Sequence, residues 1–75
     1  MNRFRYVEAE QHFRLALARD DSDASLWSWI GESLEAQGRL VEAIDFYRGA
    51  VERRPDRAVL REKLNQAEAK LSGLR

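Results

Sequence analysis

The sequence contains an internal repeat with a period of 34 residues, and no other feature of the sequence limits the fold as strongly. The stretch FRYVEAEQHFRLALAR, which begins at Phe4, aligns with GRLVEAIDFYRGAVER, which begins at Gly38. The identical pairs are Arg5 and Arg39, Val7 and Val41, Glu8 and Glu42, Ala9 and Ala43, Arg14 and Arg48, Ala16 and Ala50, and Arg19 and Arg53. A period of this length is typical of proteins built from repeated helical pairs.

Apolar residues recur at steps of three and four along the chain, as they do on one face of a helix. They are Tyr6, Ala9, Phe13, Ala16 and Leu17; Trp27, Ile30 and Leu34; Leu40, Ala43, Ile44, Tyr47, Ala50 and Val51; and Leu60, Leu64, Ala67, Leu71 and Leu74. This spacing predicts four amphipathic helices and no strand, an all-α fold. The connections are about two to five residues long, so neighbouring helices should run antiparallel.

The segments between the periodic stretches contain residues that begin or end helices. Ser22 or Asp23 is expected to cap the second helix and Asp56 the fourth, because each offers a side-chain oxygen to unpaired N–H groups. Gly38 should supply the left-handed residue after the second helix. Pro55 should prevent the third helix from continuing.

Residues 24–57 resemble one complete tetratricopeptide repeat. The resemblance rests on Trp27, Ile30, Gly31, Leu34, Ala43, Tyr47, Ala50 and Pro55. It implies a right-handed solenoid of helical hairpins. In that arrangement residues 1–23 form the second half of a preceding repeat, and residues 58–75 form a capping helix of the same single domain.

The residue types of this repeat suggest how its two helices pack. Trp27 should be a core residue, because it lies on the face of the first helix that meets the second. Gly31 has no side chain and should let Ala43 and Ala50 come close to its backbone, with Tyr47 filling the space beside them.

The two ends of the chain are expected to differ. On the last helix, polar residues replace the large-small-large apolar set of the complete repeat, which favours a cap with a polar outer face. These polar residues are Arg61, Asn65 and Glu68, whereas Leu60, Leu64, Ala67 and Leu71 should point back at the repeat. The first helix carries apolar residues where a missing helix would sit, and an exposed patch of this kind usually marks an interface.

This first-helix patch predicts self-association as a two-fold homodimer, which would leave no polymerising end. Its residues are Phe4, Tyr6, Ala9, Phe13 and Ala16. Glu10 and His12 occupy positions where the third helix has Ile44 and Phe46, which suggests partial adaptation to an exposed end.

The resemblance also implies a concave groove that binds peptides or helices of partner proteins. The expected groove residues are Ser25, Ser28, Trp29, Glu32, Glu35 and Ala36, continued by Val59, Glu62, Lys63, Gln66 and Lys70. Ser28 and Glu32 stand where a clamp for a C-terminal carboxylate would need basic or amide side chains, so that chemistry is not supported. Glu32 and Glu35 would tolerate a basic or polar ligand, or they form a solvated face.

Trp29 has two interpretations. It points roughly 200° away from Trp27 on a helix, so both indoles cannot enter the same core. Trp29 either anchors an interface or folds onto the first helix near Phe4 or Tyr6 and extends the core.

Composition excludes several other functions. His12 is the single histidine, the chain has no cysteine, and no serine has a base at a spacing that suggests catalysis, so we expect no enzyme, metal or cofactor. The 13 basic and 13 acidic residues are mixed, and the arginines near the third loop alternate with carboxylates, which argues against nucleic acid. No apolar run would span a membrane or serve as a signal peptide, and a cytoplasmic location is expected.

The sequence therefore predicts a non-enzymatic protein-interaction module, a scaffold that binds a protein or peptide and forms a homodimer through its incomplete first repeat. The alternative is a truncated or engineered repeat scaffold with no independent function.

Overall fold

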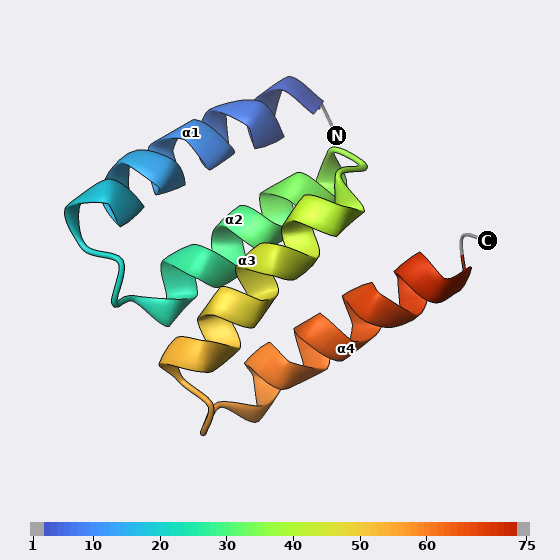
Figure 1. Ribbon diagram of the computed structural model, residues 1–75. Helices are drawn as coiled ribbons and strands as arrows, with labels where there is room; N and C mark the ends of the chain where they lie inside the picture. Colours follow the sequence, from blue (N-terminus) through green and yellow to red (C-terminus); the bar gives the residue numbers. More distant parts are fainter. Residues whose placement is uncertain (1–2, 74–75) are drawn as a thin grey trace.

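The computed structural model describes the backbone of residues 3–73 and the side chains of residues 5–73. It contains helices α1 (Arg3–Arg19), α2 (Ala24–Ala36), α3 (Leu40–Arg53) and α4 (Ala58–Gly73), and residues 3–73 include no strand (Figure 1). The predicted all-α fold is confirmed. The side chain of Phe4, expected in the N-terminal patch, lies outside the described residues.

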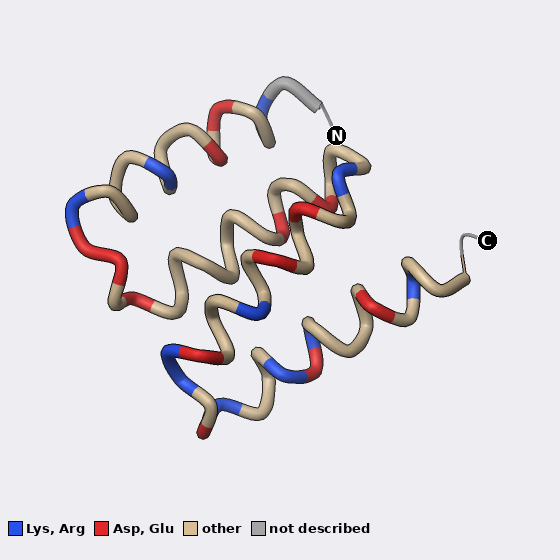
Figure 2. The backbone as a smooth tube through the Cα atoms, viewed as in Figure 1, with Lys and Arg blue, Asp and Glu red and all other residues tan. Residues whose placement is uncertain are grey.

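Each helix packs against the next one along the chain, so the four helices form a row of consecutive antiparallel hairpins (Figure 1). The Cα atoms span 37 × 33 × 16 Å, which makes the molecule a thin slab. Basic and acidic residues alternate along the backbone and no large region carries one sign (Figure 2). A slab this thin exposes a large part of every helix.

Two of the predicted helix boundaries have the expected chemistry. The Asp23 carboxylate accepts a hydrogen bond of 2.9 Å from the backbone N–H of Ser25 and caps α2. Gly38 follows α2 with a φ of 80°, which a residue with a Cβ rarely adopts. Asp56, which was expected to cap α4, instead accepts hydrogen bonds from the guanidinium of Arg54.

The core lies between α2, α3 and α4 and forms two clusters. Buried residues of the larger cluster are Ile30, Leu34, Ala43, Ile44, Tyr47 and Ala67, with Phe13 and Leu17 of α1 packed against it. The smaller cluster contains Ala24, Ala50 and Leu60, with Trp27 and Val51 packed against it. Leucine and isoleucine at helical spacing therefore form the core that the sequence predicts.

Two glycines make the closest contacts between α2 and α3. A Cβ on Gly31 would lie 2.6 Å from Cε1 of Tyr47, so the tyrosine ring occupies the space that was expected to admit Ala43 and Ala50. A Cβ on Gly49 would lie 2.4 Å from Cε3 of Trp27. Each glycine therefore provides a seat for one aromatic ring from the opposite helix.

Trp27 packs against the core, as predicted, but its side chain is only half-buried. Its indole N–H donates a hydrogen bond of 2.9 Å to the backbone carbonyl of Asp21. The guanidinium of Arg53 lies 3.9 Å from the centre of its ring, and the Phe46 ring centre is 5.5 Å away. The ring lies at the edge of the core because there the indole N–H can donate its hydrogen bond to a backbone carbonyl.

Helix α4 packs on the rest of the molecule through Leu60, Leu64 and Ala67. Leu60 and Ala67 are buried, and Leu64 packs against the core, as predicted. Leu71 is 39% exposed, because the helix extends beyond the core at its end. Glu68 was expected on the polar outer face, but its carboxylate pairs with Arg48 of α3 at 3.3 Å.

Candidate protein-interaction surfaces

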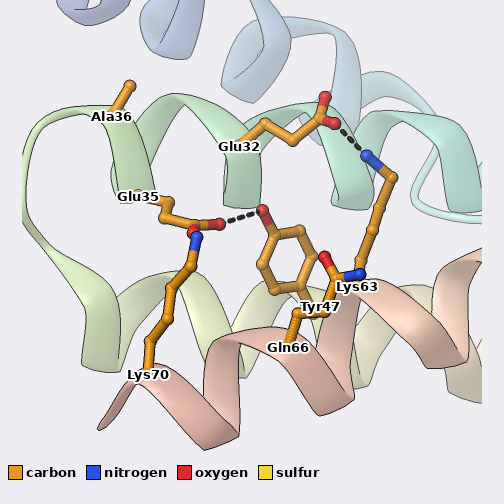
Figure 3. Close-up of a pocket in the computed structure, with 7 residues that line it drawn as sticks. All are labelled: Glu32, Glu35, Ala36, Tyr47, Lys63, Gln66 and Lys70. Atoms are coloured by element: carbon orange, nitrogen blue, oxygen red, sulfur yellow. Dashed lines mark hydrogen bonds and ion pairs between the residues drawn. The ribbon is translucent and has the colours of Figure 1, made fainter. Parts of the chain in front are cut away.

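A groove of about 410 Å³ lies between α2 and α4. Figure 3 shows the side chains that line it, which are Glu32, Glu35, Ala36, Tyr47, Lys63, Gln66 and Lys70. Six of these were expected in the groove, and Tyr47 was not. The hydroxyl of a tyrosine with a buried ring usually forms a hydrogen bond. This preference was the one property of the sequence that could have placed the Tyr47 hydroxyl in the groove.

The charges in this groove are paired with one another. Lys63 forms an ion pair with Glu32, and Lys70 forms one with Glu35 (Figure 3). The Tyr47 hydroxyl donates a hydrogen bond of 2.8 Å to Glu35. These contacts join α4 to α2 across the groove and leave it without an excess of either charge.

The pKa values reflect this pairing. Partial burial raises the pKa of Glu35, but the hydrogen bonds from Lys70 and Tyr47 outweigh it, so the net pKa lies below the usual value. Burial and the neighbouring carboxylate raise the pKa of Tyr47 well above its usual value. Glu35 is therefore ionised and Tyr47 neutral at neutral pH.

Several residues predicted for the groove lie elsewhere. Ser28 is only 4% exposed, because it faces the interior of the helical row. Ser25 is half-buried, and its hydroxyl accepts a long hydrogen bond of 3.5 Å from Arg57. Trp29 turns toward α1, and Glu62 is exposed outside the lining of the groove.

A second hollow, of about 350 Å³, lies between α1 and α2. Its lining is mostly apolar and consists of Tyr6, Ala9, Phe13, Trp29, Glu32 and Ser33. Trp29 is 45% exposed, and its ring centre lies 5.3 Å from that of Phe13. We use the term N-terminal face for the surface formed by Tyr6, Ala9, Phe13, Ala16 and Trp29.

The internal repeat provides a direct comparison for this face. Ala43, Tyr47 and Ala50 of α3 are 0%, 2% and 0% exposed, because α2 covers them. The equivalent α1 residues Ala9, Phe13 and Ala16 are only half-buried. Among residues 5–73, no second helix covers α1 as α2 covers α3. The N-terminal face is therefore a helix-docking surface of the same type, for which residues 5–73 supply no covering helix.

Glu10 anchors α1 to the rest of the molecule. It is 7% exposed, and its carboxylate accepts hydrogen bonds from Arg14 at 2.7 Å, Gln37 at 2.9 Å and Arg39 at 3.0 Å. Burial raises the pKa of Glu10, but the bonds from Gln37 and Arg14 and the charge of Arg39 bring it below the usual value. The expectation that Glu10 adapts α1 to an exposed end is wrong, because the residue turns inward.

Neither surface contains the elements of a metal site or a membrane span. Within residues 3–73, no three side chains of the histidine, cysteine, aspartate or glutamate type come together as metal ligands. The same residues include no helix with the length and apolarity that crossing a bilayer requires.

Comparison with known proteins agrees with this geometry. Residues 4–58 match the family model described as tetratricopeptide repeat. No curated protein matches the chain. The matched residues include α1, α2 and α3, and therefore both helices of the complete repeat and the helix that presents the N-terminal face.

Proposed function

The chain belongs to the tetratricopeptide-repeat family, and on this basis we propose that it takes up a helix of another protein molecule on its N-terminal face. Repeats of this family typically act as interaction modules without catalytic activity. The single observation that carries the proposal is the difference between Tyr47, which is 2% exposed, and its repeat equivalent Phe13, which is half-buried.

The physical argument is the gain from covering apolar surface. Ala9 and Ala16 are small and leave room for a helix backbone, while Phe13 and Trp29 offer aromatic rings to its side chains. Each Å² of apolar surface removed from water contributes about 25 cal/mol. A helix seated on this face would cover the rings at its centre, where binding energy usually concentrates.

The groove between α2 and α4 is a weaker candidate. A charged ligand would have to separate Lys63 from Glu32, or Lys70 from Glu35, before it could pair with either. We assign to those ion pairs the role of holding α4 against the complete repeat, which fits the proposal that residues 58–75 are a capping helix. The polar residues Arg61 and Asn65 are exposed on α4 and support that role.

Self-association is the first use of the N-terminal face to test. Two copies that joined their N-terminal faces around a two-fold axis would cover both apolar surfaces at once. In sedimentation equilibrium, self-association would raise the average mass from one chain toward two as concentration increases. Phe13→Glu should abolish the rise, whereas Leu71→Glu, on the far helix, should not.

A mass of one chain at every concentration would contradict self-association. If, in addition, the N-terminal face bound no helix of any other protein, the proposed function would fail as a whole.

A further inference from the structure

One edge of the N-terminal face carries a row of basic residues. Arg5, His12 and Arg19 follow one another at intervals of seven residues, so they lie nearly in line along α1, next to Ala9 and Ala16. All three are exposed. Within residues 5–73, neither Arg5 nor Arg19 forms an ion pair, although Glu8 lies between them along the helix. We call this row the basic edge.

The basic edge contrasts with the other arginines that lie at helix contacts. Arg14 and Arg39 pair with Glu10, and Arg48 pairs with Glu68. A row of arginines that forms no ion pairs among residues 5–73, beside an apolar face that no second helix of those residues covers, favours an occupant that supplies negative charge.

Shape restricts the occupant further. In the complete repeat, α2 places Gly31 against Tyr47 and Trp27 against Gly49. The repeat equivalents of those two α3 residues on α1 are Phe13 and Leu15. Leu15 is 68% exposed and has a branched side chain where Gly49 has none. A helix on α1 therefore needs a small residue opposite Phe13 and has no seat for a tryptophan like Trp27.

We propose that the N-terminal face binds an acidic amphipathic helix of a partner protein, which runs antiparallel to α1. The partner helix carries a small residue opposite Phe13 and carboxylates along the side that meets Arg5 and Arg19. This inference rests on the proposed function and names the chemistry of its partner.

A second copy of the chain fits the same face less well. When two copies of α1 pack antiparallel around a two-fold axis, each edge of one helix meets the same edge of the other. The basic edge of one copy would then face the basic edge of the other, and like charges at such a distance weaken association. Self-association should therefore strengthen with added salt, whereas binding of an acidic helix should weaken.

The test uses two synthetic helical peptides of about 15 residues with the same apolar face, which has alanine at its centre and leucine around it. One peptide carries glutamate on the edge that meets the arginines, and the other carries lysine there. Fluorescence anisotropy of the labelled peptides gives their dissociation constants for the full chain at about 50 mM and about 300 mM salt.

We expect the glutamate peptide to bind about tenfold more tightly than the lysine peptide at low salt, and the difference to shrink at high salt. The double variant Arg5→Glu/Arg19→Glu should reverse the preference. Both arginines are exposed and form no ion pair with any other residue of 5–73, so this variant should fold normally. Arg61→Glu, the same type of substitution at one exposed position on α4, should leave the preference as it is.

Each other result has a defined meaning. Equal binding of the two peptides, abolished by Phe13→Glu, would overturn the acidic partner and support the proposed function. Failure of both peptides to bind, with a mass of two chains in sedimentation, would identify the second copy as the occupant and overturn the acidic helix. Failure of both peptides with a mass of one chain would overturn both proposals.

Discussion

At Gly31 and Gly49 the backbone of a helix is itself the contact surface for an aromatic ring. Tyr47 lies against the first and Trp27 against the second, at distances that leave no room for a Cβ. Glycine within a helix is unfavourable by roughly 1 kcal/mol relative to alanine. The repeat keeps both glycines because close ring packing offsets this cost.

Replacing Gly31 by alanine should therefore destabilise the protein, although alanine is the better helix former. The added methyl group would meet the Tyr47 ring, which is 2% exposed and has little space to move. Overpacking of this kind typically costs about 1–3 kcal/mol, and after the gain of about 1 kcal/mol in helix propensity we expect a net loss of up to about 2 kcal/mol. Urea denaturation measures it.

The matched control is Gly73→Ala, at the end of α4, where a Cβ would have no atom within 4 Å. We expect this variant to be at least as stable as the original chain. Gly31→Ala with unchanged or increased stability would show that the ring can move aside.

Glu10 should make stability depend on pH. Its pKa in the folded protein lies below the usual glutamate value of 4.5, so the ionised carboxylate stabilises the fold at and above that pH. This contribution is lost as the pH falls through the folded pKa. At neutral pH, we expect Glu10→Gln to lower the free energy of unfolding by about 1–3 kcal/mol.

Denaturation of both proteins between about pH 7 and about pH 3 provides the measurement. The difference between original and variant should narrow with acidification, since protonated Glu10 resembles glutamine. A difference that stays constant over this range would mean that the charge of Glu10 is not what anchors α1.

At the scale of elements, the leucine nearest the start of α4 is buried far more deeply than the one near its end. Leu60 is 3% exposed and joins Ala24 and Ala50, whereas Leu71 is 39% exposed. We expect Leu60→Ala to cost about 2–5 kcal/mol and Leu71→Ala about 1 kcal/mol or less. Thermal denaturation compares them, and equal losses would contradict this description of how α4 docks.

The helices themselves could be predicted from the sequence, because apolar spacing and end signals such as Asp23 and Gly38 act locally. Packing within a helix pair was harder to predict. The absence of a side chain at Gly31 indicated that a group on α3 approaches the α2 backbone closely. The pattern did not show that this group is the Tyr47 ring rather than two alanines. Spacing reveals which residues share a face, but the shapes of side chains on two helices decide which of them touch.

The groove was predicted in part. Glu32, Glu35 and Gln66 line the groove, as the resemblance implies. Ser28 is instead buried, and the Trp29 ring packs against Phe13. The family pattern describes a helix with neighbours on both sides. Beside an uncovered α1, a large side chain such as Trp29 gains more contact by turning toward the apolar hollow than by facing the groove.

At the scale of the whole molecule, the two sides of the helical row differ in chemistry. The side formed by α4 is polar, and its groove charges are paired internally, while the side formed by α1 is apolar with a basic edge. The sequence predicted the apolar patch from its spacing. The sequence did not predict how much of the patch α2 covers. This coverage depends on the position of α1, which Glu10 fixes through its hydrogen bonds to Gln37 and Arg39 beside the turn after α2.

The most direct test of the docking surface uses the two tryptophans as reporters in one nuclear magnetic resonance experiment. The Trp29 indole lies in the N-terminal face, whereas the Trp27 indole N–H is bonded to Asp21 at the edge of the core. During titration with the glutamate peptide, we predict that the indole N–H signal of Trp29 shifts and that of Trp27 stays in place. A stationary Trp29 signal, with shifts confined to Trp27 or to the groove residues Glu35 and Lys70, would contradict docking on the N-terminal face.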